Sequence, residues 1–470
     1  MKTIHRHHPP APPAPEIETN EVETDAVSKR PLRRGPVWRV VGGSMAAGFV
    51  GAIVLTVGVL GGAPEPVIAG SALLAFAAGW AMLAVLSDRY TRHPQNWARA
   101  PAVAMALCGL GLLVGRPDDH ALNNIGWVWP PFAVALAVWM FNRVRHGLPG
   151  RVRWLVYPVV ASIALGAAGA MYETASTSYD QSSHPAPGTL YDVGGHRLHL
   201  DCTGSGSPTV VLENGLGETS PSWLRISSGV ARTTRVCAYD RAGQGWSDDV
   251  SAPQDGLAIA ADLHTLLMRA GEQGPFVLVG HSAGGPYALT FAARYPDDVA
   301  GLVLLDSMSP DAFTALPGFT AEQAMMHRGL GVLPSLTRLG IGRLLPASVW
   351  SSLPEPAASQ VRSFSSSPRG MRNMRDEQSM YPKVFGQARA LTSLSRTPLI
   401  VLVATESIDT HQEWVGLQDR LVSLSTNSQH RIVNATHAGL VGDAASSPSS
   451  VQAINDVIES IRTGQPVSVR

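Results

Sequence analysis

Residues 277–287 of this chain read Val-Leu-Val-Gly-His-Ser-Ala-Gly-Gly-Pro-Tyr. A short apolar run is followed by a Gly-x-Ser-x-Gly turn, and a helical apolar pattern starts at Tyr287. In such a strand-to-helix turn the flanking Gly280 and Gly284 let other backbone approach closely, and the serine hydroxyl stands clear of its neighbours. The stretch therefore predicts that Ser282 is a nucleophile held at a sharp elbow.

The composition limits what the rest of the chain can be. The 470 residues carry 36 basic and 36 acidic side chains, which argues against a nucleic-acid partner. Charged residues make up only 15%, against about 25% in an average soluble domain. The three cysteines, Cys108, Cys202 and Cys237, match no zinc or haem spacing, so we predict no metal site and no cofactor.

The N-terminal third is predicted to be a membrane region. Residues 1–35 are rich in Pro, Glu and Thr without an apolar period, which indicates a disordered cytoplasmic tail. A membrane span needs about 20 apolar residues. About five transmembrane helices are expected within residues 36–172, over the runs 40–62, 66–86, 100–114, 125–141 and 154–171. Pro130 and Pro131 should kink the fourth.

Charges between the apolar runs predict the topology. Basic residues cluster before the first run and in every second loop, as the positive-inside rule expects for cytoplasmic segments. They are Lys29, Arg30, Arg33, Arg34, Arg39, Arg89, Arg92, Arg99, Arg143, Arg145, Arg151 and Arg153. The chain after residue 172 should therefore lie outside the cytoplasm. No charged side chain lies deep inside a run, so we interpret the region as an anchor in the lipid bilayer rather than a transport path.

After a polar linker at residues 173–187, strand and helix patterns alternate. Gly194-Gly195 joins the two arms of a hairpin at residues 190–193 and 197–202. Further strands are predicted at 209–212, 235–239, 276–279, 301–305, 398–404 and 430–433, with helices at 258–270 and 451–461. Residues 307–396, rich in Met and Leu, are predicted to be a helical cap.

This order resembles the α/β-hydrolase superfamily. The resemblance rests on the hairpin, the Asn214-Gly215-Leu216-Gly217 loop, the Asp240-Arg241-Ala242-Gly243-Gln244-Gly245 loop, the elbow, the cap and a late histidine. It covers about residues 188–461. The implied fold class is an α/β-hydrolase fold with a helical cap, in a domain at residues 188–465, preceded by an all-α transmembrane region.

The resemblance also implies roles for individual residues. Its chain order is serine, acid, histidine. His437, in the loop after the last strand, is the expected base, ahead of His411 and His430. The acid should follow the strand at 398–404, where Asp409 fits the family's spacing best. The alternative acids are Glu406 and Asp306.

Two backbone amides and one disulfide complete the expected site. By resemblance, the N–H groups of Leu216 and Ala283 form the oxyanion hole, although many members carry a histidine where this chain has Asn214. In this fold the second and fourth strands are neighbours. Because Cys202 and Cys237 fall on those strands, a disulfide is expected if the domain is extracytoplasmic.

These expectations combine into a functional hypothesis. The chain is predicted to be a membrane-anchored serine hydrolase that cleaves an ester-like bond in an apolar small molecule through an acyl-enzyme. Relatives that act on epoxides or haloalkanes carry Asp at the elbow, which disfavours those reactions. The alternatives are a peptidase or thioesterase of the same fold and a catalytically silent binding or sensing module. The sequence indicates neither the substrate nor the oligomeric state.

Overall fold

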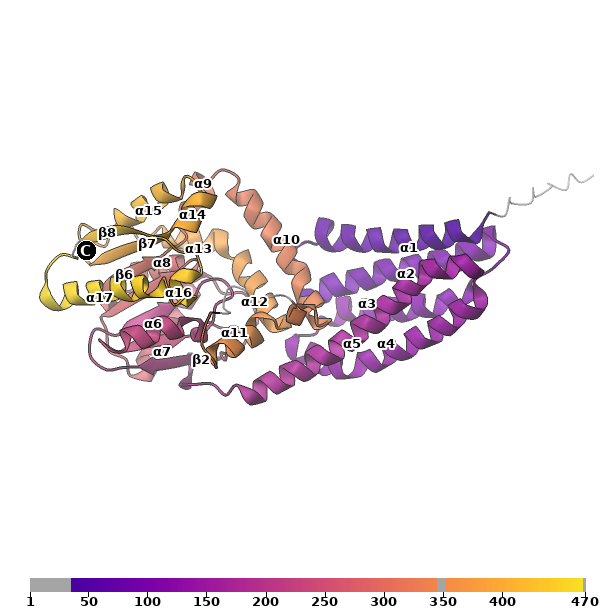
Figure 1. The fold of residues 1–470 in the computed structure, drawn as a ribbon, viewed down its shortest axis with the longest axis horizontal. Helices are drawn as coiled ribbons and strands as arrows, with labels where there is room; N and C mark the ends of the chain where they lie inside the picture. The colour runs from indigo at the N-terminus through magenta and orange to yellow at the C-terminus, as the bar shows by residue number, and fades with distance from the viewer. Residues whose placement is uncertain (1–34, 345–351, 468–470) are drawn as a thin grey trace, which may run out of the picture.

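A computed structural model describes residues 35–344 and 352–467, so the predicted tail lies almost wholly outside the described residues. Figure 1 shows a helical bundle at one end of an elongated molecule and an α/β domain at the other. The bundle contains α1 (Val37–Ile53), which continues as η1 (Val54–Val59), and then α2 (Glu65–Tyr90), η2 (Asn96–Ala98), α3 (Arg99–Gly115), α4 (Asp119–Gly147), η3 (Gly150–Val152) and α5 (Arg153–Ser183).

Four of these helical segments are long and apolar enough to cross a membrane. They are Val37–Val59, Glu65–Tyr90, Asn96–Gly115 and Gly150–Ser183. The segment Asp119–Ile125 qualifies only together with Trp129–Gly147, at a bend of 45°. The bend lies just before Pro130 and Pro131. Each proline removes a helical hydrogen bond to the carbonyl four residues earlier, which accounts for the bend. The predicted kink is therefore confirmed.

The linker predicted at residues 173–187 is mostly helical instead, because α5 continues to Ser183. Its polar residues Glu173, Thr177 and Asp180 are spaced so that they share one helix face. All three contact the guanidinium of Arg343, a residue far away in the sequence. Polarity in this stretch therefore reflects a tertiary ion-pair cluster rather than a flexible connection.

The α/β domain is built on one eight-stranded sheet with the order β1-β2-β4-β3-β5-β6-β7-β8. The pairs β1–β2 and β2–β4 are antiparallel, and the other neighbours are parallel. The strands are β1 (Thr189–Asp192), β2 (Arg197–Thr203), β3 (Val210–Glu213), β4 (Val236–Tyr239), β5 (Phe276–His281), β6 (Val299–Leu305), β7 (Leu399–Ala404) and β8 (Ser428–Val433). Each predicted strand is present, with ends shifted by a few residues.

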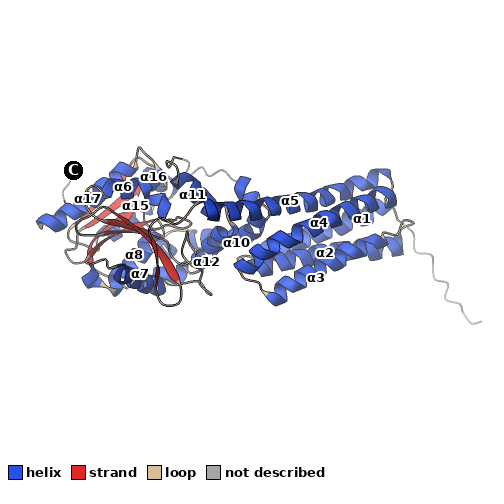
Figure 2. Cartoon of the chain, turned by 90° about the horizontal axis from the view of Figure 1, so that it is seen from below, coloured by secondary structure: helices blue, strands red, loops and turns tan. Residues whose placement is uncertain are grey.

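Helices cover both faces of the sheet because its central strands are apolar on both sides. Val210 and Leu212 pack towards α6 and α17, whereas Val211 between them packs towards α7 and α8. Figure 2 shows these two layers of helices around the sheet. The helices and turns outside the cap are η4 (Ser220–Trp223), α6 (Leu224–Val230), α7 (Gly256–Ala270), α8 (Gly284–Arg294), η5 (Pro296–Asp298), α14 (Thr405–Thr410), α15 (Trp414–Val422), α16 (Gly439–Gly442) and α17 (Ser447–Thr463).

The chain between β6 and β7 forms the helical cap. Its elements are α9 (Ala312–Ala315), α10 (Phe319–Arg338), η6 (Ile341–Leu344), α11 (Ala357–Ser365), α12 (Pro368–Ser379) and α13 (Tyr381–Ala388). In Figure 1, α10, α11 and α12 lie between the sheet and the bundle. The cap thus touches the α/β domain on one side and the ends of the bundle helices on the other.

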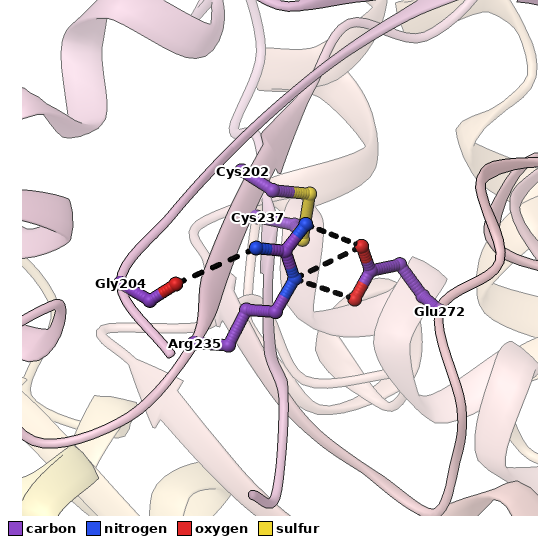
Figure 3. Close-up of a disulfide and its surroundings, with 5 residues drawn as sticks. All are labelled: Cys202, Gly204, Arg235, Cys237 and Glu272. Atoms are coloured by element: carbon purple, nitrogen blue, oxygen red, sulfur yellow. Dashed lines mark hydrogen bonds and ion pairs between the residues drawn. A yellow bond between two sulfur atoms is a disulfide. The ribbon is translucent and has the colours of Figure 1, made fainter. Parts of the chain in front are cut away.

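The predicted disulfide is confirmed. Cys202 on β2 is paired in register with Cys237 on β4, and their sulfur atoms are 2.05 Å apart. Figure 3 shows the bridge beside the ion pair in which Arg235 donates to both carboxylate oxygens of Glu272. Both sulfur atoms are used in the covalent bond, so their closeness to Glu272 does not make a metal-ligand set.

Candidate active site

The elbow serine is held in a backbone conformation that side-chain-bearing residues seldom adopt. Ser282 has φ +53° between β5 and α8. Its amide donates to Leu305 O at 3.1 Å, and its carbonyl accepts from Met308 N–H at 2.9 Å. A Cβ on Gly284 would overlap the backbone of Glu213, so glycine is required there. Among the described residues, the half-buried Ser282 hydroxyl has no hydrogen-bond partner and is available to a ligand.

His437 follows β8 and pairs with the carboxylate at the end of β6. Its Nδ1 lies 2.6 Å from Asp306 Oδ2. An ionised carboxylate only accepts hydrogen bonds, so Nδ1 carries the proton and Nε2 of a neutral ring keeps its lone pair. The His437 ring centroid lies 4.6 Å from that of His281, the residue before the serine. The histidine is therefore oriented as a proton acceptor close to the elbow.

Asp306 is fully buried and has three side-chain donors. Besides His437, the Trp414 indole donates to Oδ1 at 2.8 Å, and the Ser407 hydroxyl donates to Oδ2. Burial acts to raise the pKa of Asp306, but the bond and charge of His437, with the other donors, bring that pKa below its ordinary value. The carboxylate thus stays ionised at neutral pH and can stabilise a positive charge on His437.

Asp409, the acid favoured from spacing, does not lie against His437. It is exposed on α14 and lines an open hollow of ≈ 500 Å³ together with Glu406 and Thr436. Glu406 accepts from the backbone N–H of His437 at 2.6 Å, so it supports the loop rather than the ring. The carboxylate that contacts the imidazole is therefore Asp306, one of the two alternatives, and not Asp409, because α14 starts directly after β7 and leaves Asp409 exposed.

The two predicted oxyanion amides flank the serine. Ala283 is the next residue, and a Cβ on Gly215, the neighbour of Leu216, would lie 3.2 Å from Ser282 Cβ. Among the described residues, neither the Leu216 nor the Ala283 amide donates a hydrogen bond. Free amides in a buried site must find an acceptor, and a negatively charged oxygen fits that requirement.

A buried ion pair joins the loop of Leu216 to the loop of His437. Glu218 accepts from Gly215 N–H at 2.6 Å and lies 2.5 Å from His281 Nδ1. The opposite ring atom, His281 Nε2, lies 3.1 Å from the carbonyl oxygen of His437. Both ring nitrogens face acceptors, an arrangement that favours the imidazolium form of His281. Burial opposes this charge, but Glu218 raises the pKa of His281 above its ordinary value.

A second buried network fixes the cap above the same loop. Arg241 donates to Glu213 at 3.1 Å, to Asn214 O at 2.7 Å and to Glu377 of α12 at 2.6 Å. Burial, partly offset by Arg241, raises the pKa of Glu213 to about 7. The Asn214 side chain bridges Tyr239 O and Trp223, which explains why an amide suits this position. The loop after β4 thus connects the Asn214–Gly217 loop to α12 of the cap.

Glu218 and Glu377 are parts of the site that the sequence analysis did not identify. Glu218 follows the Asn214–Gly217 loop and could have been noticed as an acid beside a glycine turn. Glu377 is 136 residues from its partner Arg241, so only the tertiary structure reveals the pair. His281, inside the elbow, makes a buried pair with Glu218 that its position in the sequence does not predict.

Comparisons with known proteins agree with this fold. Residues 208–326 match the family model described as alpha/beta hydrolase fold. An uncharacterized protein of Schizosaccharomyces pombe is 26% identical over 404 residues, which are 75% of this chain and 71% of that protein. The uncharacterized protein YbdG of Bacillus subtilis is 26% identical over 166 residues, which are 35% of this chain and 50% of its own length.

A solved structure shows the same architecture. A proposed alpha/beta hydrolase from Nostoc sp. PCC 7120 superposes with a TM-score of 0.50 at 18% identity, over 57% of this chain and 97% of that structure. The chain therefore contains an α/β-hydrolase domain with an eight-stranded mixed sheet, preceded by helices apolar enough to span a membrane.

Proposed function

We propose that this protein is a membrane-anchored serine hydrolase that cleaves an ester-like bond, with its hydrolase domain outside the cytoplasm. The observation that carries the proposal is the strained Ser282 elbow beside a histidine whose Nδ1 is fixed by a buried carboxylate. A serine hydroxyl is a weak nucleophile unless such a base takes its proton.

The proposed reaction uses groups of this chain alone. His437 Nε2 takes the Ser282 proton as the oxygen attacks the carbonyl carbon, and Asp306 stabilises the imidazolium that forms. The Leu216 and Ala283 amides donate to the resulting oxyanion. His437 returns the proton to the leaving alcohol, and the acyl group stays on Ser282. Water, deprotonated by His437, then releases the acid and restores the serine.

The surroundings support an apolar substrate and a membrane location. Met374 of α12 packs against Gly217, which places a flexible apolar side chain beside the proposed oxyanion loop. On the bundle, large apolar side chains such as Phe132 and Leu165, each 72% exposed, face outwards. Such exposed apolar surface is stable in lipid rather than in water. The Cys202–Cys237 bridge fits an oxidising location.

The test is labelling of the detergent-solubilised full-length protein with a fluorophosphonate probe. Wild type and a control, Ser379→Ala at an exposed serine of the cap, should label. Ser282→Ala should not. An ester series of increasing acyl length would then identify the substrate class. A folded wild type that does not label would contradict the proposal and favour a binding or sensing module.

A further inference from the structure

The cap of the hydrolase domain also rests on the polar ends of the bundle helices. Arg338, the last residue of α10, pairs with Glu65 at the start of α2 and with Asp119 at the start of α4, each at 2.5 Å. Arg343 of η6 pairs with Glu173 at 2.8 Å and Asp180 at 2.6 Å, both on α5. These charged pairs lie where the apolar part of the bundle ends on the side of the cap, and they define a level along the bundle axis.

Residues 339–344 form a turn after α10, which we call the cap turn, and its first residue, Leu339, reaches past this level. A Cβ on Gly169 of α5 would overlap the carbonyl group of Leu339, and one on Gly166 would lie 3.8 Å from the Leu339 side chain. Gly169 lies one helical turn before Glu173, or about 6 Å along the axis, and Gly166 about 10 Å. The start of the cap turn therefore packs against the apolar section of α5.

The side chains described around this contact are apolar and exposed. Ile341 and Leu344 of the cap turn are 39% and 80% exposed. On α5, Leu165 and Tyr172, beside the packed glycines, are 72% and 58% exposed. Arg338 and Arg343 are neutralised by carboxylates, so they leave no free positive charge at this place. The cap turn packs beside Leu165, so both share the same surroundings, either lipid or water.

The geometry points to lipid acyl chains as the partner of the cap turn, in the leaflet nearest the hydrolase domain. This inference rests on the proposed membrane anchoring. It means that the cap over Ser282 is itself held in the bilayer interface, where an apolar ester partitioned into the leaflet would meet it. A paired charge above an inserted apolar turn is also the arrangement expected at an interface.

Depth-dependent fluorescence quenching tests the inference on the full chain in phosphatidylcholine vesicles. Cys108→Ala removes the free thiol, and the bridged Cys202 and Cys237 do not react. Leu344→Cys is then labelled with bimane, with Ile341→Cys as a second position. Leu165→Cys serves as the membrane control, and Met268→Cys, 64% exposed on α7, as the aqueous control.

Nitroxide-labelled phosphatidylcholine should quench the labels at 341, 344 and 165, with a shallow nitroxide more effective at 341 and 344 and a deep nitroxide more effective at 165. Aqueous iodide should quench the label at 268 most strongly. Labels at 341 and 344 that behave like the label at 268 would overturn the lipid contact, while quenching at 165 would leave the anchoring intact. Loss of lipid quenching at 165 as well would overturn both. Neither readout depends on hydrolysis, so a failure of the proposed reaction would be seen separately.

Discussion

The carboxylate that faces His437 comes from the end of β6, next to the strand that carries Ser282. Substituting it removes the group that fixes the histidine tautomer. We expect Asp306→Asn to lower kcat/KM on an ester by about 10³–10⁴-fold while the fold is retained, as observed when a triad aspartate is made neutral. Asp409→Asn is the matched control, because its exposed side chain lies apart from the imidazole. The reverse ranking would restore Asp409 as the acid.

The Glu218–His281 pair makes a prediction about pH. The pKa of His281 is raised above 6.5 in the folded protein, mainly by Glu218 acting against burial. The folded state therefore holds this proton more tightly than the unfolded state. The contribution of the pair to stability is fully present below pH 6.5 and is lost as the pH rises through the raised pKa.

The wild-type urea midpoint, followed by tryptophan fluorescence in detergent, should fall as the pH rises above 6.5 and through the raised pKa of His281. His281→Gln should be less stable at pH 6.5 and should lack that part of the decline. A His281→Gln slope equal to that of wild type would show that the ring is neutral. The pKa of Glu218 is lowered, so protonation of this acid weakens the pair only below pH 4.5.

Local sequence could predict the sharp turn at Ser282 and the loop position of His437, but not which carboxylate contacts the His437 imidazole. Ser282 is defined by its own turn, and His437 by its place after the last strand. The acid depends on which strand end lies beside the His437 loop. The sheet order brings Asp306 there, while the immediate start of α14 after β7 turns Asp409 to solvent. Spacing along the chain does not contain that information.

At the scale of elements, α12 of the cap is joined to the sheet by one buried charge cluster. Arg241 lies between Glu213 and Glu377, all three are at most 6% exposed, and Gln244 also donates to Glu377. Glu377→Ala would leave the buried guanidinium of Arg241 with one carboxylate partner, Glu213, instead of two. We expect a loss of about 3 kcal/mol in the free energy of unfolding.

Urea denaturation of the full-length protein measures this loss, with Ser379→Ala on the exposed side of the same helix as the control. A Glu377→Ala midpoint equal to that of the control would mean that apolar contacts alone hold α12. Fluorophosphonate labelling of the same samples would show whether Ser282 stays reactive when the cap is loosened.

The strands were easier to predict than the connections between domains. Short β-branched runs bounded by glycine and proline determine the strands locally, so the predicted ends differ by only a few residues. The C-terminal part of α5 has no such signal. Its residues Glu173, Thr177 and Asp180 share one helix face, and their countercharge, Arg343, comes from the cap. The contact between the cap and the bundle, rather than a local sequence signal, therefore explains why α5 continues to Ser183.

At the scale of the whole molecule, Arg338 holds the hydrolase domain on the bundle. Its side chain is 17% exposed and donates to Glu65, Asp119 and Asn123 from two bundle helices. Arg338→Ala would leave two nearly buried carboxylates poorly paired. Breaking such a cluster costs about 3 kcal/mol or more, which corresponds to roughly 100-fold faster exchange if the contact opens locally.

Hydrogen exchange followed by mass spectrometry should show this acceleration in Arg338→Ala at the C-terminal end of α10 and the start of α2. Arg420→Ala, which removes an exposed ion pair with Asp311, should leave both segments unchanged. Ser282 labelling should persist, since the α/β domain has its own core on both faces of the sheet. Unchanged exchange in Arg338→Ala would place the stability of the junction in the apolar packing of the cap turn on α5.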